Sequence, residues 1–182
     1  LLGLWVVFVN ACSLASEEFF RHTEADRTLI ALEMLKTGQY FVPHLLGSYI
    51  LTKPPVFYWL IAASISMFGS AAEWVARVPS VVAAALLVVS NFAFLRYVLK
   101  GDLAARNEQA LLSSLFLSTG VLFLSLAGVA EIDMVFGLFC TITLYSVYAA
   151  ILRASWVWFL VAYFLAGISF LIKGPPIVFF VA

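Results

Sequence analysis

Long apolar stretches without a charged residue recur along this 182-residue chain, at 78–95, 110–130, 134–152 and 154–172. Each is close to the roughly 20 apolar residues that a helix needs to cross a bilayer. Hydrophobic residues make up 64% of the chain and charged residues 11%. Because a globular core cannot hide so much apolar surface, we expect lipid to be the solvent. The sequence therefore predicts an all-α, polytopic transmembrane helix bundle.

The two ends of the chain are apolar as well. The run 1–16 lacks the small-residue cleavage pattern of a signal peptide, so we interpret it as a first transmembrane helix. The run 174–182 has the composition of the beginning of another span. We therefore expect residues 1–182 to be the N-terminal part of a single transmembrane domain, with an external loop and interfacial helices at about 17–74.

The apolar run 56–68 is short for a helix that crosses a membrane. At 1.5 Å per residue it rises roughly 20 Å, against a hydrocarbon core of about 30 Å. We predict a re-entrant or interfacial helix there, followed by a turn and by a true span that starts near Arg77. The loop at 17–53 and the segment 130–134 then lie on one side of the membrane.

Basic residues predict which side faces the cytoplasm, because short loops rich in Lys and Arg normally do. Four basic residues fall on the side opposite the loop: Arg96, Lys100, Arg106 and Arg153. The loop would then face the periplasm or exterior of an inner (plasma) membrane. The count alone does not decide, because inverting the protein also puts most bases inside if 56–68 spans. If the carboxylates of Glu24 and Asp133 act together, both must lie on the same side of the membrane, and this requirement decides between the two topologies.

Charged residues gather directly after the first apolar run, at 21–36. Thr23 to Asp26 fits a capping box, in which a hydroxyl and an acid satisfy the first helical amides. We predict an amphipathic helix from there to Gly38, lying on the membrane surface. One stripe of this helix is apolar: Leu29, Leu32 and Leu35.

Two acids at the start of this helix are candidates for function. Asp26 is explained by the capping box, and it is also an alternative base. Glu24 lies in the first turn, where the helix dipole favours an anion, and this alone is sufficient for its presence. A functional role for Glu24 requires a second group nearby. We predict that Glu33 and Lys36 lie on a solvated face.

Composition excludes some classes of function. The formal net charge is zero, which removes any case for nucleic acid as a partner. Cys12 and Cys140 both lie in apolar runs, so a disulfide between them is not expected, and no metal-ligand spacing is present.

Several sequence blocks, in a fixed order, carry a resemblance to a known family. They read "TEADRTLIALEML", "LTKPPVFYWLIA", "RVPSVVAA", "AEIDMVFGLF" and "FLIKGP". The chain resembles the bacterial polyprenyl-phosphate-sugar glycosyltransferases of the C-type superfamily, which include lipid A aminoarabinose transferases and relatives of protein O-mannosyltransferases. The resemblance covers nearly the whole chain and is weak for the substrate.

The resemblance implies a pair of catalytic carboxylates. The family has an acidic motif, usually Asp-Glu, in its first external loop, and here Thr23 and Glu24 occupy that pair. The missing aspartate leaves Glu24, or Asp26 from a shifted position, and we prefer Glu24. The family's second carboxylate, in a Thr-x-Asp-Met or Leu-Asp-like motif, matches Asp133. Glu131, two residues away, is interpreted as solvated.

The resemblance also implies cations for the donor's phosphate. The Lys-Pro-Pro block matches Lys53 and the lysine of the "KGP" block matches Lys173, with Arg27 and Arg77 as further candidates. Many relatives have Glu before the first lysine, where this chain has Thr52, so a metal contact there is not carried over. Two carboxylates still leave room for a divalent metal ion.

The implied reaction moves a sugar from a polyprenyl phosphate to an acceptor hydroxyl at the extracytoplasmic face, with inversion. A carboxylate takes the acceptor's proton, and Lys or Arg stabilises the departing phosphate. The implied partners are a polyprenyl-phosphate-linked sugar, membrane lipids and an acceptor that is a lipid such as lipid A, a protein or another glycan. Such a protein would serve cell-envelope modification, either of lipid A or of glycosylated protein.

The alternative is a polytopic lipid or sugar-lipid transporter without transferase chemistry. A transporter predicts charged side chains midway along spans that are broken by Gly or Pro. This chain keeps nearly all its charges at span ends and in one long loop, which favours chemistry at an interface.

Overall fold

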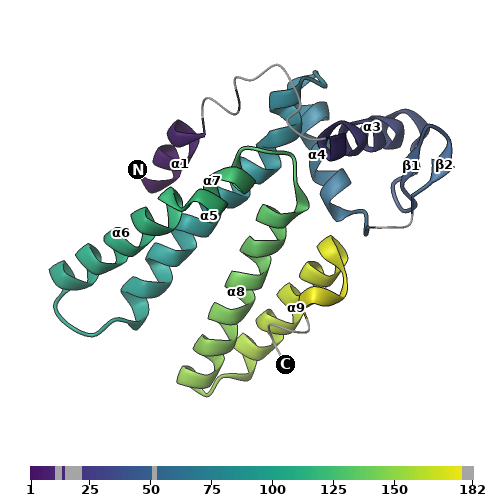
Figure 1. Ribbon diagram of the computed structural model, residues 1–182. Coiled ribbons are helices and arrows are strands. Elements are labelled where there is room, and N and C mark those ends of the chain that lie inside the picture. The colour runs from purple at the N-terminus through teal and green to yellow at the C-terminus, as the bar shows by residue number, and fades with distance from the viewer. Residues whose placement is uncertain (11–13, 15–21, 51–52, 178–182) are drawn as a thin grey trace.

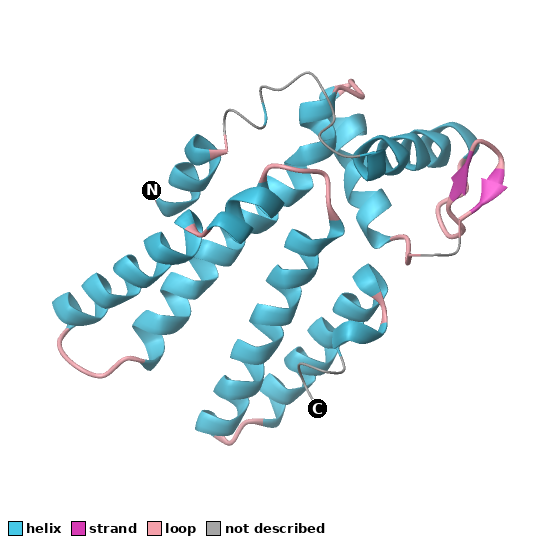
Figure 2. Cartoon of the chain, in the orientation of Figure 1, coloured by secondary structure: helices cyan, strands magenta, loops and turns pink. Residues whose placement is uncertain are grey.

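Helices form the architecture of the chain (Figures 1 and 2). The computed structural model describes residues 1–10, 14, 22–50 and 53–177. The described helices are α1 (Leu2–Val9), α3 (His22–Thr37), α4 (Val56–Phe68), α5 (Glu73–Val98), α6 (Leu103–Thr119), α7 (Val121–Ala127), α8 (Ile132–Arg153) and α9 (Trp156–Lys173), with a 3₁₀ turn at Pro175–Ile177. The all-α prediction is confirmed. One small hairpin, β1 (His44–Leu45) paired antiparallel with β2 (Ser48–Tyr49), is added in the loop.

Three of the described helices, α5, α8 and α9, are long and apolar enough to cross a membrane, and α6 with α7 makes a fourth if the bent pair is one span. These four spans alternate in direction along the chain. The loop region with α3, α4 and the hairpin lies at one end of them, and the α5–α6 and α8–α9 turns lie at the other (Figure 1). Arg96, Lys100, Arg106 and Arg153 therefore share the end opposite the loop, as predicted.

The helix α4 has the bounds 56–68 that the sequence predicts, and it is too short to be counted among the spans. It ends at Gly69, whose φ of +64° is a left-handed conformation that glycine adopts without strain. The following span begins at Glu73, one helical turn earlier than predicted, so that Arg77 lies inside α5. The predicted spans at the two ends, 1–16 and 174–182, lie partly outside the described residues. Cys12 and Thr52 lie outside them as well.

The charge-free stretch 110–130, predicted to be long enough to span, is divided between α6 and α7. The helix α6 begins at Leu103, because Asp102 caps it by accepting the amide of Ala105 at 2.9 Å. It ends at Thr119, and α7 leaves at an angle of 66°. Gly120 is extended and interrupts the helical hydrogen bonds, while the Ser118 and Thr119 hydroxyls donate to carbonyls of the preceding turn.

A polar chain joins three of the spans within the bundle. The Tyr145 hydroxyl of α8 donates to Asn91 Oδ1 of α5 at 3.0 Å, and Asn91 Nδ2 donates to Ser114 Oγ of α6 at 3.1 Å. The Tyr145 ring also stacks on Phe94, with centroids 3.8 Å apart. In lipid there is little hydrophobic drive between helices, so such bonds and close packing hold the spans together.

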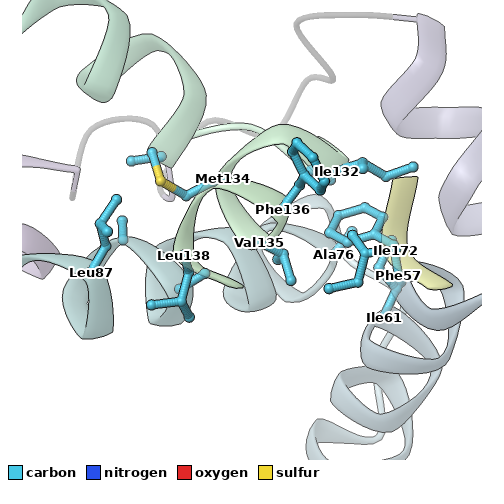
Figure 3. Packing of buried hydrophobic residues seen from close by; sticks show 14 of the residues in the cluster. Phe57, Ile61, Ala76, Leu87, Ile132, Met134, Val135, Phe136, Leu138 and Ile172 are labelled. Carbon is cyan, nitrogen blue, oxygen red and sulfur yellow. The ribbon is translucent and has the colours of Figure 1, made fainter. Parts of the chain in front are cut away.

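Part of the apolar core packs between the first turns of α8 and the helices α4, α5 and α9 (Figure 3). Ile132 and Val135 of α8 pack with Ala76 of α5 and Phe57 of α4, all nearly fully buried. Ile172, near the end of α9, joins the same cluster. This packing fixes the first turn of α8 and the last turn of α9 against the short helix α4.

The buried face of α3 differs from the predicted leucine stripe. Ile30, Ala31 and Met34 are buried, whereas Leu29 is 44% exposed. Glu24 and Thr28 lie on the same buried face as Ala31, at helical spacings of four and three residues. The face turns inward because its polar first turn finds partners within the protein.

We predict that Tyr145→Phe lowers the free energy of unfolding of the detergent-solubilised full-length protein by about 0.6 kcal/mol, the average for such a bond in a membrane. Tyr148→Phe is the matched control, because Tyr148 is half exposed and touches Phe94 only by its ring edge. Thermal unfolding would measure both. Equal losses in the two variants would show that the hydroxyl of Tyr145 contributes nothing.

Candidate active site

The site forms at the loop end of the spans (Figure 1), around the segment 128–131 and the first turn of α8, which α3, α5 and the end of α9 each contact. Three carboxylate–cation pairs connect these elements among the described residues: Glu24–Arg77, Glu131–Arg27 and Asp133–Lys173. All three join residues that are distant in the sequence. They bring together the two carboxylates that the sequence proposes, Glu24 and Asp133, at the same end of the bundle.

The first pair is completely buried. Glu24 of α3 and Arg77 of α5 have no exposed surface, and Arg77 Nε donates to Glu24 Oε1 at 3.2 Å. The same oxygen accepts the backbone N–H of Ala130 at 2.6 Å. Glu24 thus binds α3 to both α5 and the start of α8. Arg77 was expected at the mouth of a span, where it could reach a phosphate, and it lies instead within this pair.

The second pair involves Glu131, which sequence reasoning placed in solvent. That interpretation is wrong, because Glu131 is 5% exposed and its carboxylate binds the Arg27 guanidinium. The Thr23 hydroxyl donates to Glu131 Oε1 at 2.5 Å. Thr23 lies within the helix, which begins at His22, so the predicted capping box does not form. Its hydroxyl binds across to α8 because Glu131 offers a charged acceptor.

One feature of the sequence points to Glu131 as a paired carboxylate. It is an acid between two long charge-free runs, and a carboxylate in such surroundings requires a cation or a donor nearby. Its partner, Arg27, is 104 positions away in the numbering, so the pattern does not name it.

One turn of α3 therefore holds Ala130 from both sides. Glu24 accepts the Ala130 N–H, and Arg27 Nη1 donates to the Ala130 carbonyl at 2.9 Å. From α5, the Ser80 hydroxyl donates to the Glu131 carbonyl at 3.2 Å. Asp133, in the first turn of α8, follows directly. The position of Asp133 is thus fixed by the backbone just before it.

The third pair lies where side chains are accessible. The Lys173 ammonium, at the end of α9, donates to Asp133 Oδ1, with 29% of the lysine side chain and 36% of the aspartate side chain exposed. Lys173 Nζ also lies 5.4 Å from the centroid of the Phe136 ring, within cation–π range. Both residues lie at helix ends, as predicted. Asp133 also lines an apolar hollow of about 550 Å³ between α5, α6–α7 and α8.

Lys53 and Lys173 line one pocket. Its volume is about 410 Å³, and its other walls include Phe41, Pro43 and Phe170. Pro54 and Pro55, which follow Lys53 and precede α4, are also part of the wall. Proline restricts its own φ and the residue before it, so the pair directs the chain at Lys53. Two cations that are distant in the sequence thus face the same apolar-walled space.

The remaining candidates lie elsewhere around the site. Arg27 is partly buried, with its guanidinium 5.8 Å from the centroid of the Phe57 ring. Asp26 is exposed at the start of α3. Tyr58 of α4 lies near both: burial raises its pKa, the Arg27 charge lowers it and the Asp26 charge raises it. The phenol therefore stays protonated at neutral pH and remains a donor.

A divalent ion needs several oxygen ligands arranged around it. Within the described part of the chain, no group of three His, Cys, Asp or Glu is placed to hold a metal ion. The carboxylates of the site are bound by cationic side chains instead.

Comparison with known proteins agrees with this architecture. The structure of ArnT from Cupriavidus metallidurans bound to undecaprenyl phosphate superposes with a TM-score of 0.83 over 97% of this chain and 32% of that chain, at 18% identity. The apo structure of the same protein gives 0.79. The chain thus has the C-type glycosyltransferase fold of ArnT.

Sequence comparison identifies the family. Residues 52–182 match the sequence model of the dolichyl-phosphate-mannose-protein mannosyltransferase family. The chain belongs to this family. An uncharacterized protein of Aquifex aeolicus is 30% identical over 91% of this chain and 31% of its own length. An undecaprenyl phosphate-α-4-amino-4-deoxy-L-arabinose arabinosyl transferase of Pseudomonas savastanoi pv. phaseolicola is 30% identical over 80% of this chain and 27% of its own length.

The chain spans about a third of the length of these relatives. Its apolar helices and its family make it an integral membrane protein. None of these comparisons favours the transporter alternative.

We predict that Arg77→Met lowers the free energy of unfolding by about 3–5 kcal/mol, because it leaves the Glu24 carboxylate buried without its cation. The double variant Glu24→Gln with Arg77→Met should lose less than the sum of the two single variants. Arg96→Met is the control, since Arg96 is exposed at the other end and should change stability by less than about 0.5 kcal/mol. Additive losses in chemical unfolding of the purified full-length protein would contradict the pairing.

Proposed function

We propose that this chain provides the donor-phosphate site and the proton-accepting carboxylate of an integral membrane glycosyltransferase. The enzyme moves a sugar from a polyprenyl-phosphate donor to an acceptor hydroxyl. The observation that carries the proposal is the placement of Lys53 and Lys173 on one apolar-walled pocket, with Asp133 bound to Lys173. Membership in a family of sugar transferases that use a lipid-phosphate donor supports it.

The pocket suits both halves of such a donor. A phosphate monoester or diester carries negative charge, which two ammonium groups bind through charge-assisted hydrogen bonds. The isoprenoid chain is apolar, and the aromatic and proline side chains of the walls offer it an apolar surface. The pocket lies at the end of the spans, where a lipid phosphate meets the membrane interface. The name of the arabinosyl transferase relative, which includes undecaprenyl phosphate, supports a donor of this class.

Asp133 is proposed as the carboxylate that takes the acceptor's proton. The acceptor oxygen loses its proton to Asp133 as it forms a bond to the anomeric carbon, and the bond from that carbon to the phosphate oxygen breaks. The polyprenyl phosphate leaves with the electron pair, so its negative charge grows during the reaction. Lys173 binds Asp133 in the structure, so its ammonium is close to the proposed base. Together with Lys53 it also stabilises the leaving phosphate.

Glu24 remains the second proposed carboxylate of the site, with a different part in the reaction. Glu24 binds Arg77 of α5 and the backbone N–H of Ala130, which favours a role in positioning the first turn of α8. Arg77 and Arg27 share this task through their carboxylate partners. Asp26, exposed at the start of α3, remains the alternative base.

The acceptor and the orientation are parts of the proposal as well. Lipid A, another glycan and a protein hydroxyl are the acceptor classes, and the names of the arabinosyl transferase relatives support 4-amino-4-deoxy-L-arabinose as the class of sugar. The basic residues gathered at the opposite end of the spans support an active site facing the periplasm or exterior of the inner membrane, with residues 17–74 outside.

We predict that Asp133→Asn lowers the transfer rate about 100-fold or more, because it removes the proposed base. Glu24→Gln should lose most turnover through misplacement of α8. The measurement is transfer of radiolabelled 4-amino-4-deoxy-L-arabinose from undecaprenyl phosphate to lipid A by the full-length protein in liposomes. Glu108→Gln, at the opposite end, is the control. Unchanged transfer in both site variants would refute the assignment.

We predict that Lys53→Ala raises the donor KM about tenfold or more, since a hydrogen bond to a charged group is lost. Lys173→Ala should lower kcat in addition, because Lys173 binds both the phosphate and Asp133. Lys100→Ala, an exposed lysine at the far end, should leave both constants unaltered. A donor KM and kcat that do not change in Lys53→Ala would count against the phosphate site.

A further inference from the structure

Glu131 occupies an unusual position for a carboxylate. It is the N-cap residue of α8, yet its side chain makes no capping hydrogen bond to its own helix. A carboxylate there would normally accept the free amides of the first turn. This carboxylate turns away from α8 and binds Thr23 and Arg27 of α3. The Glu131 carboxylate therefore connects α8 to α3 and does not cap α8.

Each of the two carboxylate oxygens of Glu131 binds a side chain from the first turns of α3. Oε1 accepts the Thr23 hydroxyl at 2.5 Å, and Oε2 is the atom nearest the Arg27 guanidinium. Arg27 in turn donates to the Ala130 carbonyl at 2.9 Å, one residue before Glu131. The side chain and the backbone of the same short segment are therefore bound by one arginine.

Burial makes the charge of Glu131 consequential. The residue is 5% exposed, and its backbone carbonyl is bound by the buried Ser80 hydroxyl. A charged group in such a place must have its partners, since a partly satisfied buried network is costly. A neutral side chain of the same shape would release Arg27, which would then be free to leave the Ala130 carbonyl.

Asp133 lies two residues beyond Glu131, in the first helical turn. Its own contact, to Lys173, comes from α9 and not from α3. The orientation of Asp133 relative to Lys173 therefore depends on how the backbone at 130–131 is held. Displacement of a catalytic group by about 1 Å can lower a rate about 100-fold.

We infer that Glu131 is a positioning residue of the transfer site: its negative charge, placed between Thr23 and Arg27, sets Asp133 against Lys173. This inference rests on the proposed function, since Asp133 is its proposed base. Glu131 acts through Asp133 and does not itself contact the substrate. The charge must lie at this place, whichever chain segment provides it.

The first test removes the charge and then restores it from the other side. Glu131→Gln keeps the shape of the side chain and should lower kcat about 100-fold with little change in donor KM. The exchange variant Thr23→Asp with Glu131→Thr puts the carboxylate on α3 beside Arg27, and should recover most of the lost rate. Thr23→Asp alone places two carboxylates together and should not exceed the unaltered protein. Glu108→Gln is the matched control.

The assay uses full-length protein in liposomes, with undecaprenyl-phosphate-linked aminoarabinose as donor and lipid A as acceptor. An unaltered kcat in Glu131→Gln would overturn the inference while leaving the proposed function in place. A reduced kcat that the exchange variant does not recover, in protein that unfolds at the usual temperature, would also overturn it.

A second measurement does not depend on sugar transfer, so it tests the role of Glu131 separately from the proposed function. Asp133→Cys, in a background with Cys12 and Cys140 replaced by Ser, is labelled with a maleimide. The inference predicts that adding Glu131→Gln changes the labelling rate at position 133, and that adding Glu108→Gln does not. Identical rates in all three proteins would overturn the inference even if the unaltered protein transferred no sugar.

Discussion

The two hydrogen bonds from α3 to the backbone of Ala130 are the interaction on which the rest of the site depends. Glu24 and Arg27, one turn apart, bind the N–H and the carbonyl of this single residue, and each also pairs with an opposite charge on another element. Buried ion pairs often add little net stability, because desolvation opposes the attraction. Their effect here is to specify one arrangement: α3 can dock in only one register if both charges are to be satisfied.

This arrangement separates the carboxylates of the site into two kinds. Glu24 and Glu131 are buried, and each is paired with an arginine. Asp133 is partly exposed and binds Lys173, which lines the pocket together with Lys53. A group that accepts a proton must be accessible, and the groups that hold it in place need not be. The buried pairs thus position the exposed one, and the apolar core shown in Figure 3 packs against the same turn of α8.

Much of the fold follows from the sequence, because lipid imposes strong constraints. Charge-free runs locate α8 and α9, and length alone separates α4 from the spans. The bend at Gly120 could not be predicted, since a glycine that follows Ser118 and Thr119 in an apolar run is also found inside unbroken helices. Sequence likewise predicted that Lys173 and Asp133 lie at span ends and that Lys53 lies at the end of the external loop. It could not find the partners of Glu131 or the inward face of α3, because both depend on residues that are distant in the sequence: Arg77 is 53 positions from Glu24, and Thr23 is 108 positions from Glu131.

Sidedness labelling tests the central claim most directly. Single cysteines replacing Lys53, Asp133, Lys173 and Lys100 would be introduced into full-length protein without native cysteines, and intact cells would be treated with a membrane-impermeant maleimide. The account predicts that positions 53, 133 and 173 react from the same face of the membrane and position 100 only from the other. Reaction of positions 53 and 133 from opposite faces would contradict it.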